Sequence, residues 1–573
     1  MRIIVFLALS LFVCQLVVGQ VPIINNVTPL TTYPQNTVLI TGSGFNNNVS
    51  QLQVWFDQVK GTITASSEFS IEVAVPPQAR ISNIEVINLS SGFSARTLEK
   101  FVLYYSGNTF NEASFLAPTA NVTTFSSGSA EESFDVCSCD LNGDDMPDLV
   151  STKSGNTSAS MMVLKNTSTP GNLAFTSQAS VIVGAPTFNI VCGDLNGDGK
   201  PELIASRAVA SRNQIFIFKN TSSAGTISFA SPTIISLDAG DNAIKPVIRD
   251  LNLDGKPDLV VSNSATSAVN TVYVFGNTSS GGNITFAAAT RILITGAATT
   301  YGIDAQDLDG DQKPEIILNQ FTSNDIFIVK NTSSVGELAF SSTIQKITLT
   351  GTLNQLTTAD FNEDGKLDIA VTSTFDDFLY VLLNQSSGSS ISFGTPTQLI
   401  TGDSPWGIDV SDIDGDQDVD IIVGNRGAET TISVFKNDGA PNPSFSKVSI
   451  TSGKKSRNLR VGDFDGDGKP DIAFTTDTGN SVDILRNMNC FMPLITNPPA
   501  TICAGQTISL ESIANAGATF DWIKDGTSAK NGNESFLDIT TPGNYSVTAP
   551  SEASSCIIYS KSIAVALGTG SLP

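Results

Sequence analysis

Short acidic segments recur along the chain, and their residue types suit a hard metal ion. In the last of these segments, carboxylates stand at positions 1, 3, 5 and 9, at Asp463, Asp465, Asp467 and Asp471. Gly468 at position 6 permits a sharp turn, and position 7 offers a backbone carbonyl. Ca²⁺ prefers several oxygen ligands in a flexible arrangement, so this pattern predicts a calcium loop. A bound dication would also offset the repulsion between the clustered carboxylates.

The pattern occurs seven times, at intervals of 51 to 57 residues, and predicts up to seven bound Ca²⁺ ions. The predicted ligands, with position 7 acting through its backbone carbonyl, are Asp140, Asn142, Asp144, Met146 and Asp148; Asp194, Asn196, Asp198, Lys200 and Glu202; Asp250, Asn252, Asp254, Lys256 and Asp258; Asp307, Asp309, Asp311, Lys313 and Glu315; Asp360, Asn362, Asp364, Lys366 and Asp368; Asp412, Asp414, Asp416, Asp418 and Asp420; and Asp463, Asp465, Asp467, Lys469 and Asp471.

Two other interpretations of the loops can be weighed on the residues. An EF-hand would carry Glu at position 12 and helical flanks, whereas Ser151 and Ala205 stand there and the flanks alternate like strands. A metal-free turn rich in Asp and Asn remains the alternative, and it is strongest where Asp145, Gln312 and Gln417 replace glycine at position 6. Seven copies in register favour metal.

The elements that position these loops are short strands. Apolar alternation of period two dominates the chain, and each repeat also contains a strand that ends in Asn and, about eight residues later, an aromatic strand. About four strands per repeat indicate a blade, so we expect an all-β chain with a seven-bladed β-propeller. The seventh repeat lacks its aromatic strand, and a matching segment, Ala113–Thr119, precedes the first repeat. That segment is expected to complete the last blade, which favours a closed ring over an open solenoid.

The repeats resemble the FG-GAP or VCBS-type repeats of secreted surface proteins and of the integrin α-subunit propeller, over about Asn108 to Asn487. The resemblance implies calcium between the first two strands of each blade. It implies no single activity, because such propellers occur in adhesion proteins, carbohydrate-binding proteins and some polysaccharide lyases.

We expect a β-sandwich on each side of the propeller. The domain boundaries are a signal peptide over 1–19, a first sandwich over 20–106, the propeller over 107–489 and an immunoglobulin-like sandwich over 490–573. The first sandwich resembles an IPT/TIG domain through Pro29, Gly42, Gly44, Phe45 and Pro76. The last resembles an immunoglobulin-like module, which implies a disulfide between Cys503 and Cys556, with Trp522 and Tyr545 between them. The pairing of Cys137, Cys139, Cys192 and Cys490 stays open.

Composition limits the function. The net charge is −24, which disfavours nucleic acid and anionic membranes as partners. The chain has no His, so Ser-His-Asp catalysis and His-ligated zinc are excluded. A basic Arg2 followed by an apolar run is typical of a secretory signal peptide, so the protein is expected to be secreted or displayed at the cell surface, without membrane insertion after the signal is removed.

Candidate ligand-binding residues stand six positions before five of the loops, at the expected start of the innermost strands: Phe134, Phe188, Tyr301, Trp406 and Arg457. Packing between blades is the alternative for these side chains. Asn166, Asn220, Asn277 and Asn331 match the glycosylation sequon, but they recur with the repeat and fit a turn equally well.

The function that we expect is a calcium-binding adhesion or recognition protein for an extracellular carbohydrate or protein ligand, and not an enzyme. One alternative is a polysaccharide lyase or hydrolase, although the paired carboxylates found here belong to the metal loops. The other is a structural spacer in an extracellular assembly that binds no ligand.

Overall fold

The computed structural model describes residues 22–567 with gaps at 33–35, 57–58, 77–78, 80–83, 91–92, 98–100, 104–109, 111–113, 116–124, 127–132, 154–159, 170–171, 179, 209–211, 224, 265–268, 297–299, 322–323, 417, 440, 468, 478–480, 489–493, 496–500, 503–506, 514–519 and 549–562. The expected signal peptide, Gln417, Gly468 and the predicted pair Cys503 and Cys556 lie outside the described residues. All elements are strands except one short 3₁₀ turn, η1 (Val49–Gln51), so the described part of the chain is all-β, as predicted.

The N-terminal segment forms two four-stranded sheets that share one hydrophobic core. Alternation explains the burial: in Thr37–Ser43, Val38 and Ile40 point into the core while their neighbours face outward. The first sheet has the order β1 (Ile23–Thr28), β3 (Thr37–Ser43), β7 (Ser70–Ala74) and β6 (Thr62–Ser66); the second has β5 (Val59–Lys60), β4 (Leu52–Phe56), β8 (Ile84–Asn88) and β9 (Phe93–Arg96). A short parallel pair, β2 (Thr31–Thr32) and β10 (Val102–Leu103), lies beside them.

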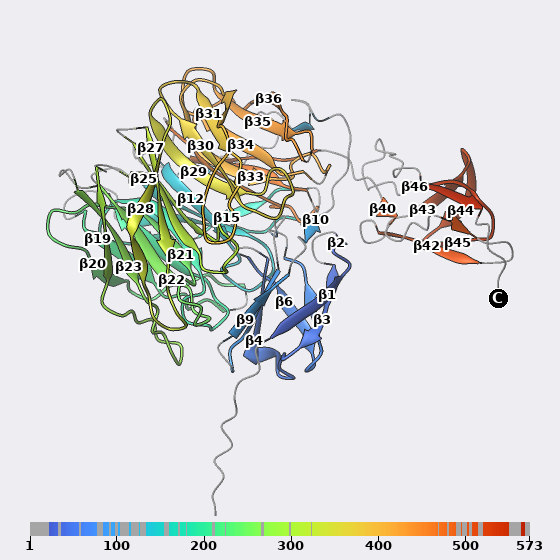
Figure 1. Ribbon diagram of the computed structural model, residues 1–573, viewed down its shortest axis with the longest axis horizontal. Helices are drawn as coiled ribbons and strands as arrows, with labels where there is room; N and C mark the ends of the chain where they lie inside the picture. Colours follow the sequence, from blue (N-terminus) through green and yellow to red (C-terminus); the bar gives the residue numbers. More distant parts are fainter. Residues whose placement is uncertain are drawn as a thin grey trace, which may run out of the picture.

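Seven antiparallel sheets follow, one for each predicted repeat, and Figure 1 shows them arranged side by side. In order from the innermost strand they are β12 (Ser133–Cys139), β13 (Asp148–Lys153), β14 (Ser160–Asn166) and β15 (Phe175–Ser177), with β16 (Val181–Ile182) also on β14; β17 (Thr187–Gly193), β18 (Glu202–Arg207), β19 (Gln214–Phe218) and β20 (Thr233–Ser236); β21 (Ala243–Arg249), β22 (Asp258–Asn263), β23 (Val269–Phe275) and β24 (Thr290–Thr295); β25 (Thr300–Gln306), β26 (Glu315–Gln320), β27 (Asp325–Asn331) and β28 (Phe340–Thr348); β29 (Leu353–Ala359), β30 (Asp368–Ser373), β31 (Phe378–Leu382) and β32 (Thr397–Ile400); β33 (Pro405–Ser411), β34 (Asp420–Asn425), β35 (Thr431–Asn437) and β36 (Phe445–Thr451); and β37 (Ser456–Gly462), β38 (Asp471–Thr476), β39 (Ser481–Leu485) and β11 (Phe125–Ser126).

The seventh sheet combines strands from both ends of the repeat region. β11 pairs antiparallel with β39, so a strand that precedes the first acidic loop supplies the outer edge of the last sheet. Phe115, in the segment expected to complete this repeat, forms a β-bridge with Asn487. The other six repeats pair their Asn and Phe in the same way; for example, Asn220 bridges to Phe229.

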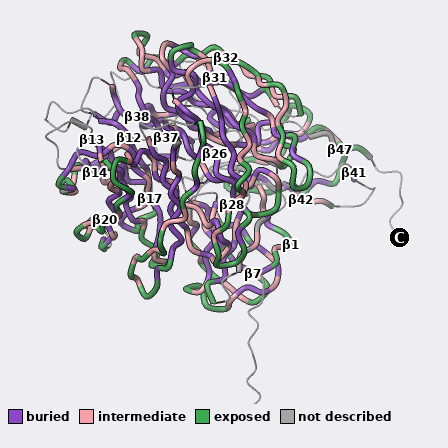
Figure 2. Tube along the Cα trace, turned by 60° about the vertical axis from the view of Figure 1, so that its left-hand side comes forward, coloured by how far each residue is buried: buried purple, intermediate pink, exposed green. Residues whose placement is uncertain are grey.

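Neighbouring sheets pack face to face through apolar side chains. Each innermost strand contacts the next along the chain, and β37 contacts β12. One hydrophobic cluster joins Val136 and Leu149 of the first sheet to Phe464 and Ile484 of the seventh, and similar clusters join the other neighbouring sheets. The strands next to the innermost ones, such as β22 and β26, are buried along their whole length, whereas outer strands such as β20 are mostly exposed. Figure 2 shows this gradient, with buried residues running through the inside of the molecule.

A buried asparagine links each sheet to the one before it. Asn277 donates one side-chain hydrogen bond to the carbonyl of Pro257 in its own acidic loop, at 2.9 Å, and another to the carbonyl of Leu195 in the preceding loop, at 2.8 Å. All seven repeats contain this pair of bonds, and the bond to the preceding loop is 2.8–2.9 Å long in each: the residues are Asn166, Asn220, Asn277, Asn331, Asn384, Asn437 and Asn487. Asn166 reaches Phe464 of the seventh repeat. We call these seven residues the asparagine clamps.

The clamps decide between the two interpretations of the sequons. The side chains of Asn166, Asn220, Asn277 and Asn331 are at most 2% exposed, and their amide nitrogens are already hydrogen-bonded. Their side-chain oxygens accept a bond from the residue two positions later, as in an Asx turn. These four positions are therefore closed to glycosylation in the folded protein.

The C-terminal segment forms two sheets around Trp522 and Tyr545, both fully buried. The first has β40 (Leu494–Ile495), β42 (Ile508–Ile513) and β45 (Phe536–Ile539); the second has β41 (Thr501–Ile502), β47 (Ile563–Leu567), β46 (Gly543–Thr548), β43 (Phe520–Lys524) and β44 (Thr527–Gly532). In Figure 1 these strands lie apart from the repeat sheets, whereas the N-terminal strands lie against them. Among the described residues, no helix is long and apolar enough to cross a membrane.

Replacing a clamp should destabilise the repeat sheets. Asn277→Ala leaves the buried carbonyl of Leu195 and the partly buried carbonyl of Pro257 without this donor, so we expect the free energy of unfolding to fall by about 2–4 kcal/mol. Asn283→Ala is the matched control, because Asn283 is an exposed asparagine of the same repeat and also begins a sequon. Denaturant unfolding of both variants measures the difference, and equal stabilities would contradict the role of the clamp.

Candidate metal centres

The acidic loops connect the first two strands of each sheet, as the resemblance implied, and the carboxylate at position 1 organises each loop. In the first loop Asp140 accepts backbone hydrogen bonds from Gly143 at 2.8 Å and from Asp145 at 2.9 Å. Gly255 and Gly365 make the equivalent bond to Asp250 and Asp360 in the third and fifth loops. The loop backbone is thus bent around the carboxylate at position 1.

The carboxylate at position 9 has a second role that the sequence did not suggest. One oxygen of Asp258 accepts a hydrogen bond from the backbone N–H of Leu251, at 3.0 Å. The other oxygen accepts one from the backbone N–H of the clamp Asn277, at 2.8 Å. All seven repeats contain this arrangement, including the two in which Glu202 and Glu315 replace Asp. Position 9 therefore ties the loop to the third strand of its sheet.

Three loops bring three carboxylates within metal-binding distance of one another. Their ligand oxygens lie within 4.8 Å in the sets Asp307, Asp309 and Asp311; Asp412, Asp414 and Asp420; and Asp463, Asp465 and Asp471. The last two sets are buried. Burial, followed by the charges of the neighbouring aspartates, raises the pKa of Asp420 and of Asp471 well above its usual value.

The donor set fits calcium. One carboxylate oxygen of Asp309 and the side-chain oxygen of Asn142, at position 3 of their loops, are buried without a hydrogen-bond donor. Buried oxygens of this kind require a cation or a donor, and oxygen-only ligands from carboxylate, amide and carbonyl groups are those that Ca²⁺ prefers. In each loop, positions 1, 3, 5 and 9, with the carbonyl of position 7, would hold the ion, which would neutralise the clustered charge and fix the turn.

Two of the loops without glycine at position 6, those with Asp145 and Gln312, adopt the same backbone as the glycine loops. Asp145 and Gln312 have φ angles of 62° and 69°, close to the 80° and 84° of Gly255 and Gly365 at the same position. Loss of glycine therefore introduces strain without changing the turn, because a side chain is disfavoured in the left-handed region.

A group of cations at the end of the third strand, or just after it, was missed at the sequence level. Lys330 contacts the carboxylate of Asp309, and Lys436 lies 2.5 Å from Asp414. Arg486 binds Asp465 and, at 2.9 Å, also Asp467. Each loop with Asp rather than Asn at position 3 thus has a basic residue opposite it.

Two further loops have a longer pairing to position 5, from Lys165 to Asp144 at 3.7 Å and from Lys219 to Asp198 at 3.9 Å. The signal was present in the sequence, because a basic residue directly precedes the clamp asparagine in these five repeats, whereas Gly276 and Leu383 stand there in the other two.

The candidate ligand-binding residues fall into two aromatic groups. The rings of Phe134 and Phe188 lie 4.8 Å apart, and the guanidinium of Arg457 lies over Phe134 at 4.7 Å. Trp406 packs against Tyr301 at 6.2 Å, with Arg426 over its ring at 4.6 Å. Phe134, Trp406 and Arg457 are at most 8% exposed.

The second group also contains residues that the sequence did not single out. Phe321 packs against Tyr301 at 4.9 Å, and Phe375, which is 69% exposed, packs against Phe321 at 6.1 Å. Much of the aromatic surface is thus used in packing, and Phe375 presents the largest exposed ring among the described residues of the two groups. Ligand binding at these residues stays a prediction.

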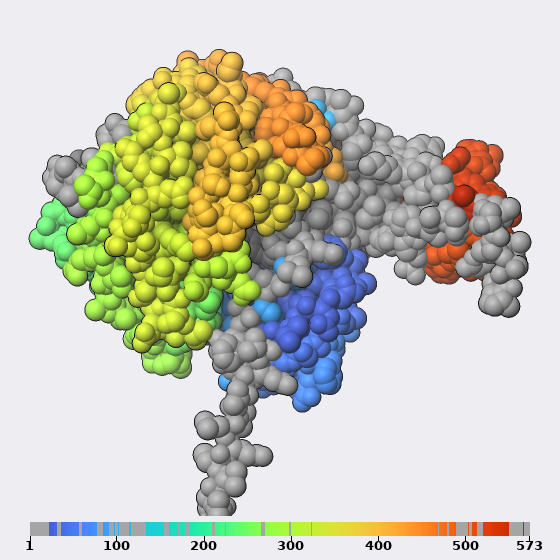
Figure 3. Space-filling model, in the orientation of Figure 1, coloured from blue at the N-terminus to red at the C-terminus, as the bar shows by residue number. Residues whose placement is uncertain are grey.

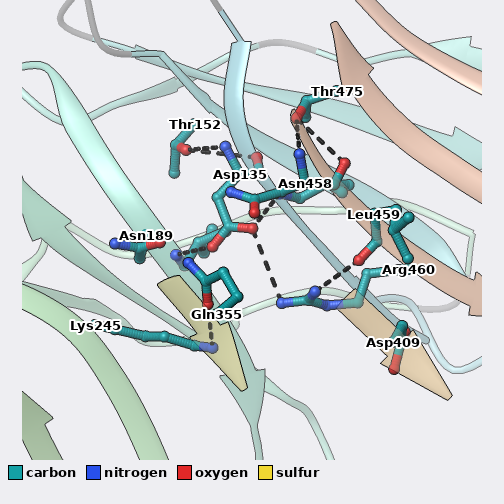
Figure 4. A network of polar contacts seen from close by, with 12 residues as sticks. Asp135, Thr152, Asn189, Lys245, Gln355, Asp409, Asn458, Leu459, Arg460 and Thr475 are labelled. Carbon is teal, nitrogen blue, oxygen red and sulfur yellow. Dashed lines mark hydrogen bonds and ion pairs between the residues drawn. The ribbon is translucent and has the colours of Figure 1, made fainter. Parts of the chain in front are cut away.

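A polar network joins several of the innermost strands. Figure 4 shows Lys245, Gln355, Asp135 and Arg460 pointing toward one another. The ammonium of Lys245 donates to Gln355 at 3.0 Å, and Arg460 lies 3.9 Å from Asp135. The surrounding protein desolvates Lys245 and, helped by the charge of Arg460, lowers its pKa. The network connects sheets that are distant in sequence.

One disulfide joins Cys139 of β12 to Cys192 of β17, with 6.5 Å between the Cα atoms. Cys139 directly precedes Asp140, and Cys192 stands two residues before Asp194, so the bond ties the first loop to the second. Cys137 is a buried free thiol, and burial raises its pKa to about 12. This pairing answers the question that the sequence left open for these three cysteines.

The repeats and the first domain match known families. The FG-GAP-like repeat matches residues 102–205, 250–318, 307–371, 360–423 and 412–474, which together make up more than half of the chain. The chain belongs to the FG-GAP-like repeat family. The IPT/TIG domain matches residues 22–99, which confirms the resemblance of the first sandwich. No curated protein matches this FG-GAP-like repeat protein.

Several solved structures show similarity to this chain. BBS1N in complex with ARL6DN matches with a TM-score of 0.42 and 14% identity, over 64% of this chain and 98% of that chain. An auxiliary nutrient binding protein from Bacteroides ovatus has a TM-score of 0.34 and 12% identity, and one from Bacteroides thetaiotaomicron has 0.33 and 11%; both matches cover 82% of this chain and 98% of that chain. With identities and TM-scores this low, these likenesses carry no inference about function.

Replacing Gln312 by glycine should relieve strain in the fourth loop. Gln312 is exposed and has a left-handed backbone, so we expect Gln312→Gly to raise the free energy of unfolding by about 1 kcal/mol. Gln345→Gly is the control, because this residue lies within the ordinary strand β28 and should lose stability. A fall in stability for Gln312→Gly would contradict the strain argument.

Calcium should stabilise the protein more strongly at higher pH. Burial raises the pKa of Asp148 to about 7 and that of Glu202 and Glu315 to about 8. In the metal-free protein these carboxyl groups contribute fully to stability at a pH below their ordinary pKa values of 3.8 and 4.5. This contribution is lost as the pH rises through the raised pKa values, because the buried groups then become charged. Ca²⁺ binds the deprotonated carboxylates, so it should restore stability mainly as the pH reaches and exceeds the raised pKa values.

The measurement is thermal unfolding with excess Ca²⁺ and with EDTA, at about pH 5 and about pH 8. We expect a larger rise in Tm with Ca²⁺ at the higher pH, and a smaller one with Mg²⁺, which requires stricter octahedral geometry. An equal rise in Tm at both pH values would mean that calcium binding does not depend on deprotonation of these carboxylates. No rise in Tm at either pH would mean that the loops are metal-free turns.

Proposed function

We propose that this FG-GAP-like repeat protein is an exported, calcium-stabilised recognition protein for an extracellular carbohydrate or protein ligand. The observation that carries the proposal is the repeated acidic loop with buried oxygens that lack donors, as at Asp309 and Asn142. Such loops stiffen a scaffold when metal binds and leave its outer surfaces free for contact. They supply rigidity and no reactive group.

The scaffold that we propose is a closed seven-bladed propeller between the IPT/TIG domain and an immunoglobulin-like sandwich. Three contacts between the first and seventh repeats support closure: the pairing of β11 with β39, the clamp from Asn166 to Phe464, and the bond from the side chain of Asn458 to the carbonyl of Phe134 at 2.9 Å. A closed ring removes the exposed edges that an open array would present.

Export is supported by the signal-like N-terminal sequence and by the disulfide. Cys139 and Cys192 form a bond that persists mainly in oxidising compartments. We therefore assign the protein to the cell exterior or surface.

A binding role is favoured over catalysis by how the carboxylates are used. Asp258 and its equivalents accept hydrogen bonds from backbone N–H groups on both oxygens, which leaves them poorly suited to proton transfer. The paired acids in the loops hold the turn or the metal, and the chain has no histidine to act as a base.

Binding of the purified protein to arrays of glycans and of extracellular proteins tests the role. We expect saturable binding in Ca²⁺ and weaker binding after treatment with EDTA, because loss of the ions loosens the loops. Heat-denatured protein at the same concentration is the control. Absence of saturable binding to either array would favour the spacer, and depolymerisation of an acidic polysaccharide would favour the lyase.

A further inference from the structure

A cavity of about 660 Å³ lies between the IPT/TIG domain and the first two acidic loops. One wall comes from β4 to β6 of the domain and includes Trp55 and Lys60. The opposite walls come from the loops that begin at Asp140 and Asp194, and the floor includes the disulfide and Arg460 of β37. Figure 3 shows the domain (blue) beside the repeat sheets. The volume falls in the range of small-ligand sites, which often form between domains.

Polar contacts hold the two sides of the cavity together. The ammonium of Lys60 lies 3.7 Å from the carboxylate of Asp194, and the hydroxyl of Thr62 donates to Asp145 at 3.3 Å. The disulfide between Cys139 and Cys192, in the floor of the cavity, fixes the distance between the two loops that form its walls. A ligand would therefore meet preformed walls.

The lining combines one flat aromatic surface with polar groups. The indole N–H of Trp55 donates to the side chain of Gln53 at 3.1 Å, and Gln53 is only 5% exposed. This bond holds the half-buried ring in place. Apolar residues such as Leu52 and Ile63 lie nearby in the wall. Hydrogen-bonding capacity comes from Asp145, an exposed carboxylate that is not in a predicted ligand position.

The charges favour an uncharged ligand. Lys60 and Arg460 face Asp194 and Asp135, so the positive charges in the lining are already opposed. Asp140, Asp194 and Asp198 are predicted metal ligands, which leaves Asp145 as the carboxylate of the described lining outside the predicted metal sites. The chain as a whole, with net charge −24, would repel polyanions.

We propose that this cavity binds a neutral mono- or disaccharide, whose apolar ring face stacks on Trp55 and whose hydroxyl groups hydrogen-bond to Asp145 and Arg460. A sugar ring has the required shape, with one apolar face and a polar edge. The proposal rests on the recognition function above and specifies its ligand class and position. The two aromatic groups beside the starts of the innermost strands take no part in it.

Titration calorimetry and tryptophan fluorescence of the full chain in Ca²⁺ test the proposal. The probes are glucose, galactose, mannose, xylose, cellobiose, maltose and lactose at millimolar concentration. The chain has three Trp, and Trp406 and Trp522 are buried, so a bound sugar should change the emission of Trp55. We expect at least one sugar to bind saturably and to change the emission.

Two variants locate the site. Trp55→Ala should weaken sugar binding by about tenfold or more through the loss of stacking. Asp145→Asn should weaken it several-fold, and Asn tolerates the left-handed backbone of this position, so the fold is preserved even if Trp55→Ala disturbs the domain. Leu293→Ala, at an exposed residue of β24, is the control and should bind as the unmodified chain does.

The outcomes distinguish a failure of the proposed sugar site from a failure of the recognition function. Sugar binding that is equal in Trp55→Ala, Asp145→Asn and the unmodified chain overturns the site but leaves the recognition function in place. Binding to the protein array without binding of any sugar overturns the ligand class alone. Absence of saturable binding both to the arrays and to the panel of sugars overturns the recognition function and this proposal together.

Discussion

Backbone hydrogen bonding at the acidic loops is the constraint on which the rest of the structure depends. Seven tight turns pack beside one another, and the carbonyls of their buried residues need donors. The clamp asparagine supplies two donors at once, one to its own loop and one to the preceding loop, while its backbone N–H satisfies the carboxylate at position 9. For Asn331 these partners are Pro314, Leu251 and Glu315. Loop, third strand and neighbouring sheet are thus joined by one residue.

This arrangement separates the loop carboxylates into two classes. The position 9 group accepts backbone hydrogen bonds on both oxygens, as Asp258 does, so it already has partners within the protein. The groups at positions 1, 3 and 5 bring negative charge together and need an external cation or a basic side chain. Asp465 and Asp467, which share Arg486, show how a repeat with an additional carboxylate offsets part of its charge internally.

Much of the fold could be predicted from the sequence because each short pattern, ambiguous in one copy, recurs seven times in register. The alternation of Asp with Asn or Gly located the loops, and the aromatic residue that recurs about eight positions after each Asn proves to be its bridge partner, as Phe229 is for Asn220. The site could be predicted only in part. The asparagine matched both a sequon and a turn, and only its burial separates them.

Other features depend on contacts between residues far apart in sequence. Cys139 and Cys192 come together because successive innermost strands are neighbours. The residues around each cysteine do not predict that contact. Phe375 stands in a turn, outside the strand positions where binding residues were sought. The cavity requires the docking of Lys60 on the second loop, and a single sequence does not specify how a sandwich meets a repeat sheet.

The pairing of β11 with β39 has a consequence for where the repeat region can be cut. A chain that begins at the first acidic loop would retain β37, β38 and β39, yet the backbone of β39 would lose the partner that covers it. An uncovered strand of this kind is a template for adding strands from other molecules. β11 therefore protects the outer edge of the last sheet from pairing with other molecules, and it belongs to the repeat region even though it precedes the first acidic loop.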